Sequence, residues 1–508
     1  MPKQPIWAKI NVFDDYWIDF KKNVLRRWYR PEKRSEYVDP NLNGGGCYQT
    51  AMWSPEQNCY LLWYEYVRDA DSDECRYLSV ARSDDGIHWE PWNRNQCDTA
   101  QKKVYPNTIY LGNPGIHGGS VYRDEREENP EWRYKLCSCG YTGLYQKRGI
   151  QNSAVILSTS PDGLHWTPHE EMEVHPNTSD TTNYFYYNPV TEEYNALIRA
   201  GFVDRRVCLT TSKDLVHWSR PKVILHPGAE FNDDAYATQF YGLVSRWMDG
   251  YFVGFLWRYY TSCGDFDYSR MKGFQDTELV YSYDGEHWMR TTGRPFQERP
   301  LPPEFGFSSL NFNSIYPDKD NEKLYLIASG SRMMHSGVGQ YPGFLEEKKA
   351  AHSAAITYEL RKDGFCGLEA NTTDGLLVTK AMELCGEDLY LNVNAAFGRV
   401  RMAVYDHQGQ PYEGFDFEDC QPIQEDGRKV RPTFKGHDIR ELRGKRIRIA
   451  LRLECATLYC IEGPLRPWIR FPQTSLCDPR HALEYAATPR PDHLSPCGAK
   501  SGYGRPKE

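Results

Sequence analysis

One short pattern recurs along this chain and limits the folds that it can adopt. Ser160-Pro-Asp162-Gly163-Leu-His165-Trp166 has counterparts at residues 83–89, 212–218 and 282–288, and residues 355–365 hold a weaker copy. Each full copy follows a run of β-forming residues, where Asp-Gly predicts a tight hairpin turn and Trp supplies a large apolar side chain on the next strand. Five such hairpins predict an all-β fold, a five-bladed β-propeller with four strands in each blade.

The repeated residues themselves are assigned to the scaffold. Their Asp, Gly, His and Trp occur in repeat after repeat, whereas a catalytic group normally occurs once in a chain. Residues that a repeat architecture needs in every unit are those that close the turn and pack the neighbouring unit.

The repeats divide the chain into four segments. Residues 1–34 precede them and are interpreted as an entry segment, and residues 35–365 are predicted to form the propeller, the domain in which we expect any active site to lie. In residues 366–463 the strands alternate apolar and polar positions without any box, which predicts a C-terminal antiparallel β-sandwich. Residues 464–508 form a Pro-rich tail that we expect to be extended or partly disordered.

Length, charge and cysteine content limit the number of domains and the kinds of partner and cofactor that this chain can have. A chain of 508 residues suggests more than one domain. The net charge is −8 and no dense Lys/Arg block occurs, which argues against nucleic acid and anionic membranes as partners. The 15 cysteines form no C-x-x-C pair and lie apart from histidines at ligand spacing, so no catalytic metal and no cofactor is predicted; a structural cation on the axis and the oligomeric state stay open.

The N-terminus carries no apolar signal segment, and no stretch of 18 apolar residues occurs. These observations predict a soluble, cytoplasmic protein without a membrane partner, or a secreted one if a signal segment was removed. Aromatic residues make up 14% of the chain, which suits both β-sheet packing and stacking on sugars.

Taken together, the boxes and the following β-sandwich resemble the clan of family 32 and family 43 glycoside hydrolases, and most of all a little-characterised branch similar to family 32. The segments that carry the resemblance are Val12-Phe-Asp-Asp-Tyr-Trp-Ile18, His117-Gly-Gly-Ser-Val-Tyr122, Glu131-Trp-Arg-Tyr-Lys-Leu136, Ser179-Asp-Thr-Thr-Asn183, Gln239-Phe-Tyr-Gly242 and Gly414-Phe-Asp-Phe-Glu-Asp-Cys420. The family motifs Trp-Met-Asn-Asp-Pro-Asn-Gly, Arg-Asp-Pro and Glu-Cys are not intact here. Asp124 follows an arginine as in Arg-Asp-Pro, but it lies in a polar turn and is interpreted as a solvated carboxylate.

The resemblance implies cleavage of a glycosidic bond in an axial funnel, which requires two carboxylates. Residues at the entrance of each inner strand and at the exit of each second strand line that funnel, and on this basis the predicted catalytic residues are Asp180, Asp234 and Glu65. Asp180 falls where family 32 places the acid of its Glu-Cys motif. The alternative for each carboxylate is a buried turn cap. The predicted substrate-binding residues are His117, Asn183, Arg199, Gln239, Arg258, Asn311 and Arg332.

Three functions remain in competition. The first is a glycoside hydrolase acting on an oligosaccharide or glycoside, with furanosides such as fructosides or arabinosides favoured by the resemblance. The second is a phosphate-dependent glycoside phosphorylase, because Arg199, Arg258 and Arg332 could bind an oxyanion, although they could equally pair with carboxylates as structural groups. The third is a non-catalytic carbohydrate-binding propeller, because the family motifs are missing.

Overall fold

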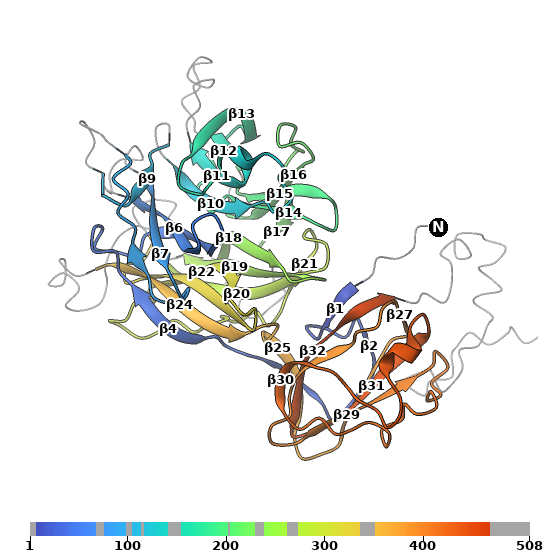
Figure 1. The fold of residues 1–508 in the computed structure, drawn as a ribbon. Helices are drawn as coiled ribbons and strands as arrows, with labels where there is room; N and C mark the ends of the chain where they lie inside the picture. Colours follow the sequence, from blue (N-terminus) through green and yellow to red (C-terminus); the bar gives the residue numbers. More distant parts are fainter. Residues whose placement is uncertain are drawn as a thin grey trace, which may run out of the picture. The chain divides into compact units, whose positions relative to one another are not determined.

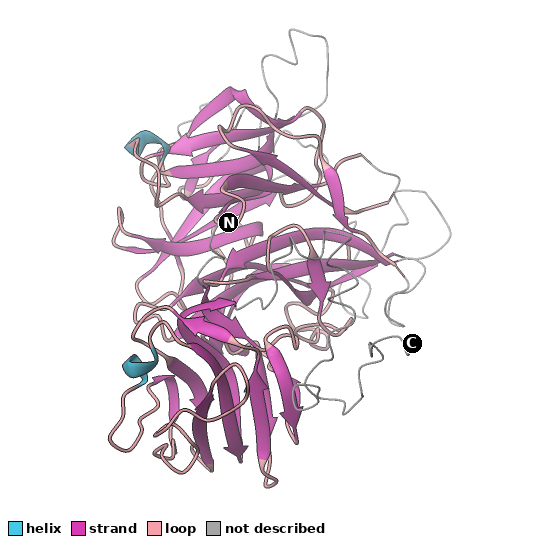
Figure 2. Cartoon of the chain, turned by 90° about the vertical axis from the view of Figure 1, so that its right-hand side faces the viewer, coloured by secondary structure: helices cyan, strands magenta, loops and turns pink. Residues whose placement is uncertain are grey.

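The computed structural model describes residues 7–67, 76–97, 104–112, 116–140, 154–201, 204–228, 238–261, 273–335 and 351–467. Strands make up nearly all of its regular structure (Figure 2), and the predicted all-β fold is confirmed. In these ranges the only helical turns are η2 (Pro130–Trp132) and η4 (Ile439–Leu442). None of the helices found there has the length and apolar character needed to span a membrane. The chain divides into two units, residues 30–362 and a second unit that joins residues 1–29 to residues 363–508.

Residues 30–362, called the first unit below, contain several antiparallel sheets (Figure 1). One consists of β5 (Cys47–Ser54), β6 (Cys59–Val67), β7 (Arg76–Ser83) and β8 (Glu90–Pro91), with β9 (Thr108–Tyr110) also paired to β7. The next consists of β10 (His117–Arg123), β11 (Tyr134–Gly140), β12 (Ala154–Ser160) and β13 (Thr167–His175). A third consists of β14 (Tyr184–Asn188), β15 (Glu193–Ile198), β16 (Val207–Ser212) and β17 (Lys222–Leu225).

The remaining sheet of this unit is eight-stranded and has two antiparallel halves. The first half is β18 (Thr238–Trp247), β19 (Phe252–Thr261), β20 (Gly273–Ser282) and β21 (Trp288–Arg290). The second half is β22 (Ser309–Pro317), β23 (Lys323–Ser331), β24 (Ser353–Arg361) and β4 (Glu32–Tyr37). A single parallel pair, Gln275 with Ser309, joins the halves. Strand β4, which comes first in the unit along the chain, therefore pairs with β24, which comes last in the unit.

The first strands of these five sets lie next to one another in a closed order. Strand β5 contacts β10, β10 contacts β14, β14 contacts β18, β18 contacts β22, and β22 contacts β5. Hydroxyl groups satisfy backbone groups at these contacts: Thr50 Oγ1 accepts from Val121 N (3.2 Å), and Ser314 Oγ donates to Ala51 O (3.0 Å). Between neighbouring sheets, where strands do not pair, hydroxyl side chains thus supply the hydrogen bonds of these backbone groups.

The recurring boxes form turns held by their own aspartates. In the copy at residues 160–166, Asp162 Oδ1 accepts from the backbone N–H groups of Leu164 (2.9 Å) and His165 (3.0 Å). Gly163 has a φ of +77°, which few other residues adopt without strain. Its carbonyl accepts from Trp63 Nε1 (2.7 Å), which ties this turn to the preceding sheet. The box therefore acts as a connector between sheets.

The second unit takes strands from both ends of the chain. Strands β1 (Trp7–Asn11), β2 (Ile18–Lys22) and β3 (Leu25–Trp28) pair with β32 (Ala456–Pro467), β26 (Gly375–Thr379) and β25 (Cys366–Ala370), respectively. The other strands are β27 (Met382–Leu384), β28 (Tyr390–Asn394), β29 (Arg399–Tyr405), β30 (Asp426–Val430) and β31 (Arg446–Glu454).

The sequence treated residues 1–34 as one entry segment. In the structure the residues before Arg30 belong to the second unit, whereas β4 belongs to the first. The sequence did not reveal this division, because strands that pair across several hundred residues leave no local pattern. The predicted Pro-rich tail lies outside the described residues from residue 468 onward.

Candidate active site

Three predicted site residues form one hydrogen-bonded chain. Glu65 lies on β6, His117 begins β10, and Asp180 lies in the loop before β14. His117 Nδ1 lies 3.0 Å from Glu65 Oε1, and its Nε2 lies 2.7 Å from Asp180 Oδ1. The imidazole thus joins a carboxylate on β6 to a carboxylate in the loop before β14, and we call Glu65, His117 and Asp180 the relay.

The backbone around the relay requires glycine at position 118. Gly118 has a φ of +63°, and a Cβ placed there would lie 1.6 Å from Thr181 O, so only glycine allows β10 and the loop before β14 to approach this closely. Gly118 N donates to Glu65 Oε2 (2.7 Å). Asn183 is fully buried and its Nδ2 donates to His117 O (3.2 Å), so the structure places it as a clamp on the backbone.

Exposure increases along the relay. The side chains of Glu65, His117 and Asp180 are 1%, 16% and 46% exposed. Glu65 is further held by Arg76, whose Nη1 lies 3.2 Å from Oε1 and also contacts His117 Nδ1. Asp180 Oδ2 lies 3.6 Å from Arg199 Nη1. Asp180 is therefore the member that can meet a solute, and Glu65 is the buried end.

Electrostatic interactions favour the charged forms of His117 and Asp180. Burial would lower the pKa of His117, but Glu65 and Asp180 raise it to about 9, against the opposing charge of Arg76. Burial would raise the pKa of Asp180, but the hydrogen bond and charge of His117, with Arg199 and Arg76, lower it to about 2. At neutral pH the relay therefore presents an ionised Asp180 carboxylate held by an imidazolium.

Tyr48 packs its ring edge-on against His117, with the centroids 5.2 Å apart. Its φ is +47°, a left-handed conformation that costs about 1–3 kcal/mol for a residue other than glycine. Burial raises the pKa of Tyr48 well above its ordinary value, so its hydroxyl stays protonated. Strained backbone of this kind concentrates at functional sites.

A group of aromatic and cationic side chains adjoins Asp180. Arg199 lies with Cζ 4.5 Å from the centroid of the Tyr241 ring, and Arg205 lies 5.5 Å from the same ring. Arg205 Nη1 donates to Gln239 Oε1 (2.7 Å). His335 lies between two tyrosine hydroxyls, each 3.2 Å away, those of Tyr241 and Tyr259.

Sequence reasoning did not select Arg76, Arg205, Tyr241 or Tyr259. Arg205 stands a few residues before β16, and Tyr241 follows the predicted Gln239 by two positions. A search that included residues next to the expected strand entrances would have found Tyr241, while Arg205 carries no pattern of its own.

Three other predicted residues, Arg258, Asn311 and Arg332, contact groups that do not belong to the relay. Arg258 is 1% exposed and pairs with Asp276 (2.9 Å) and Glu278 (3.6 Å) inside the eight-stranded sheet. Asn311 Nδ2 donates to Gln275 Oε1 (2.5 Å). Arg332 packs with Cζ 4.0 Å from the Phe305 ring, and Asp234 lies outside the described residues.

Asp124 corrects one interpretation. The sequence placed it in a turn as a solvated carboxylate, but its side chain is fully buried. It accepts from Tyr194 OH (2.7 Å) and lies 3.5 Å from the equally buried Lys135 Nζ. The residues that shield it, Tyr194 above all, come from the next sheet, so the turn alone could not reveal its burial.

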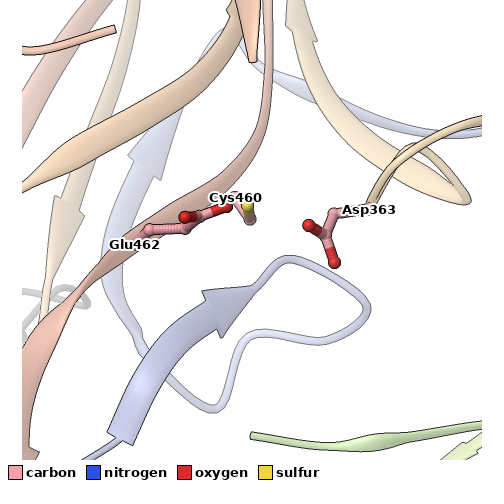
Figure 3. Close-up of side chains that lie close together, drawn as sticks. All are labelled: Asp363, Cys460 and Glu462. Carbon is pink, nitrogen blue, oxygen red and sulfur yellow. The ribbon is translucent and has the colours of Figure 1, made fainter. Parts of the chain in front are cut away.

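A second carboxylate group lies in the second unit, where Asp363, Cys460 and Glu462 have potential metal-ligand atoms within 4.8 Å of one another (Figure 3). These three residues are not available to a metal ion, because Lys9 Nζ already lies 2.9 Å from both oxygens of Asp363. Lys9 is 4% exposed, and an ammonium in contact with the carboxylate repels a cation. We therefore assign a buried ion pair here.

No family model matches the sequence, and no curated protein does either. Solved structures similar to this chain include an N-acetylgalactosamine deacetylase from F. plautii in complex with blood group B trisaccharide (12% identity, 67% of this chain and 96% of that chain, TM-score 0.45). They also include a Bombyx mori GH32 β-fructofuranosidase (14%, 86% and 94%, 0.41) and a glycosyl hydrolase from Bacteroides ovatus (14%, 65% and 90%, 0.39). At these identities and TM-scores the likenesses carry no argument about the activity of this chain.

Proposed function

We propose that this protein is a glycoside hydrolase whose first unit is a five-bladed propeller and whose chemistry takes place at Asp180. The closed order of the five first strands supports the propeller. The observation that carries the activity is the relay: it ends in a partly exposed, ionised carboxylate that an imidazolium orients. A carboxylate of this kind is the nucleophile or base that glycosidic cleavage requires.

We propose the following roles for the relay residues. Asp180, with its pKa lowered to about 2, is the base or nucleophile. His117 holds it in one orientation and keeps it ionised. Glu65 was predicted as catalytic, but its oxygens are engaged by Gly118 N, His117 and Arg76 at 1% exposure, so we assign it as a positioning residue.

A hydrolase also needs a general acid, and an ionised Asp180 does not supply that proton. Asp234 keeps that role as a proposal from the sequence alone. Furanosides are the first substrates to test, because the resemblance to family 32 and family 43 favours them.

The phosphorylase is the second candidate, and the cations beside Asp180 favour it. Arg199 and Arg205 could bind phosphate next to the scissile bond. Asp180 would have to act as an acid in such a reaction, however, and its low pKa opposes this. We therefore rank hydrolysis first.

The deciding experiment measures reducing-sugar release from furanoside and pyranoside oligosaccharides, with and without phosphate. We expect Asp180→Asn to lower kcat about 10²- to 10⁴-fold, because it removes the charged base while keeping the size of the side chain. Asp84→Asn, an exposed residue of one box, is the matched control and should keep full activity.

Retained activity in Asp180→Asn would reject the assignment of Asp180. Release that occurs only with phosphate would establish the phosphorylase, and binding of sugars without any turnover would establish the non-catalytic alternative.

A further inference from the structure

Arg205 is a buried cation, and none of the described residues supplies a carboxylate to balance its charge. Arg205 is 8% exposed, and its Nη1 donates to the neutral amide oxygen of Gln239 (2.7 Å). Within the described parts of the chain, no carboxylate pairs with it and its Nε has no hydrogen-bond partner. A buried guanidinium in this state pays the cost of desolvation without the attraction of a counter-ion.

Two other arginines of the same unit have buried side chains that are balanced by carboxylates. Arg258, at 1% exposure, has two carboxylate partners, Asp276 and Glu278. Arg290, whose side chain is 4% exposed, lies 2.6 Å from Glu278. Arg205 has no such carboxylate partner among the described residues, and its Nε–H group is available to bind an anion.

The surroundings of Arg205 join it to the relay. Its Cζ lies 5.0 Å from the centroid of Tyr259 and 5.5 Å from that of Tyr241. Arg199, whose Nη1 lies 3.6 Å from Asp180 Oδ2, has its Cζ 4.5 Å from the centroid of the same Tyr241 ring. The two aromatic faces offset part of the desolvation of the guanidinium but do not neutralise it.

Arg199 also has an N–H donor without a hydrogen-bond partner among the described residues. Its Nη2 donates to Tyr241 O (3.1 Å), its Nη1 lies 3.6 Å from Asp180, and its Nε has no hydrogen-bond partner within the described residues. Two guanidiniums with unused Nε–H groups therefore border one tyrosine ring beside the proposed catalytic carboxylate. Guanidinium groups of this kind bind oxyanions through paired N–H donors.

We propose that Arg205 and Arg199 form a subsite for an oxyanion, a carboxylate, sulfate or phosphate group, so that the glycoside cleaved at Asp180 is acidic. This inference rests on the proposed hydrolase function and names its substrate class. The same chemistry would hold inorganic phosphate, and the experiment separates the two sources of the anion.

The first arm measures turnover. Acidic glycosides (uronides, sulfated glycosides and phosphorylated glycosides) are compared with their neutral parent sugars, each with and without inorganic phosphate. For Arg205→Gln we expect KM for the acidic substrate to rise about 10- to 100-fold with a smaller change in kcat, since one charged hydrogen-bonding group is lost. Arg205→Lys keeps the positive charge but loses the paired N–H donors of the guanidinium, so its KM should lie between those of wild type and Arg205→Gln.

The second arm measures binding without turnover. Inorganic phosphate and sulfate are titrated calorimetrically into wild type, Arg205→Gln and the matched control Arg220→Gln, which changes an exposed arginine of the same unit. Circular dichroism verifies that each variant is folded. We expect wild type and Arg220→Gln to bind the anions and Arg205→Gln to lose them.

The outcomes divide clearly. Preference for acidic glycosides that disappears in Arg205→Gln supports a sugar-borne anion, and phosphate-dependent release that disappears in the same variant supports free phosphate. If no substrate turns over, the proposed hydrolase fails, but anion binding lost in Arg205→Gln still supports the subsite. Equal use of neutral and acidic glycosides by wild type and Arg205→Gln, or no anion binding by wild type, overturns it.

Discussion

Each unit of this protein contains a bonded cation–carboxylate group, and the two differ in how they end. In the second unit Lys9 Nζ lies 2.9 Å from both oxygens of Asp363, and both residues are almost wholly buried. In the first unit the relay begins at buried Glu65 but ends at Asp180, which is 46% exposed. A closed pair can only stabilise the fold, whereas a chain with an open end can also meet a substrate.

The largest effect we expect comes from breaking the closed pair. Lys9→Met leaves Asp363 as an unpaired buried charge and should lower the free energy of unfolding by about 3–5 kcal/mol. Urea denaturation measures this change, and kcat at a temperature where the variant is folded should stay unchanged. The double variant Lys9→Met with Asp363→Leu should recover much of the lost stability; a double variant no more stable than the single one would contradict the pairing.

The pH dependence of the open relay comes next. His117 has a pKa raised from 6.5 to about 9, so its contribution to stability is complete below pH 6.5 and disappears as the pH rises through 9. Asp180 has a pKa lowered from 3.8 to about 2, so its contribution is complete above pH 3.8 and disappears as the pH falls through 2. We expect kcat to fall about tenfold per pH unit above pH 9, where His117 loses its proton. An activity that stays level to pH 10 would show that the imidazolium is not needed.

Glu65→Gln sharpens the same comparison. It removes the carboxylate that raises the pKa of His117, so the alkaline limit of kcat should move below pH 9. A purely structural role of Glu65 would lower stability and leave that limit in place. Glu90→Gln, which changes an exposed carboxylate paired with Arg82, is the control.

The smallest effect should come from a box. Gly163→Ala places a Cβ 2.7 Å from the Trp63 ring at a φ of +77°, and we expect a loss of about 1–2 kcal/mol in the free energy of unfolding. Because the box connects sheets and lies outside the relay, kcat and KM should not change. A change in KM would show that the box takes part in binding.

The sequence predicted what depends on local pattern. The boxes carry their own turn-forming Asp and Gly, and the repeat therefore revealed the succession of hairpins and the all-β fold. The family resemblance and strand register selected Glu65 on β6, His117 on β10 and Asp180 in the loop before β14, and the structure brings these together.

What the sequence could not supply depends on contacts between distant segments. The sequence placed Arg258 and Arg199 at equivalent strand exits, but Arg258 lies within β19 and pairs with two buried carboxylates of β20, whereas Arg199 follows the end of β15 and lies near Asp180. The burial of Asp124 depends on Tyr194 from the next sheet. Such differences arise from which side chains face each other across sheets, and no local pattern in one segment records them.

The pairing of the first strands with the last has a consequence for synthesis on the ribosome. Strands β1, β2 and β3 find their partners only after β25, β26 and β32 have been made, and β4 waits for β24. Until then these strands emerge with unsatisfied edges, which are templates for pairing with other chains. Completion of both units is therefore a late event in translation, and a truncated product that ends before residue 353 would release these edges into the cell.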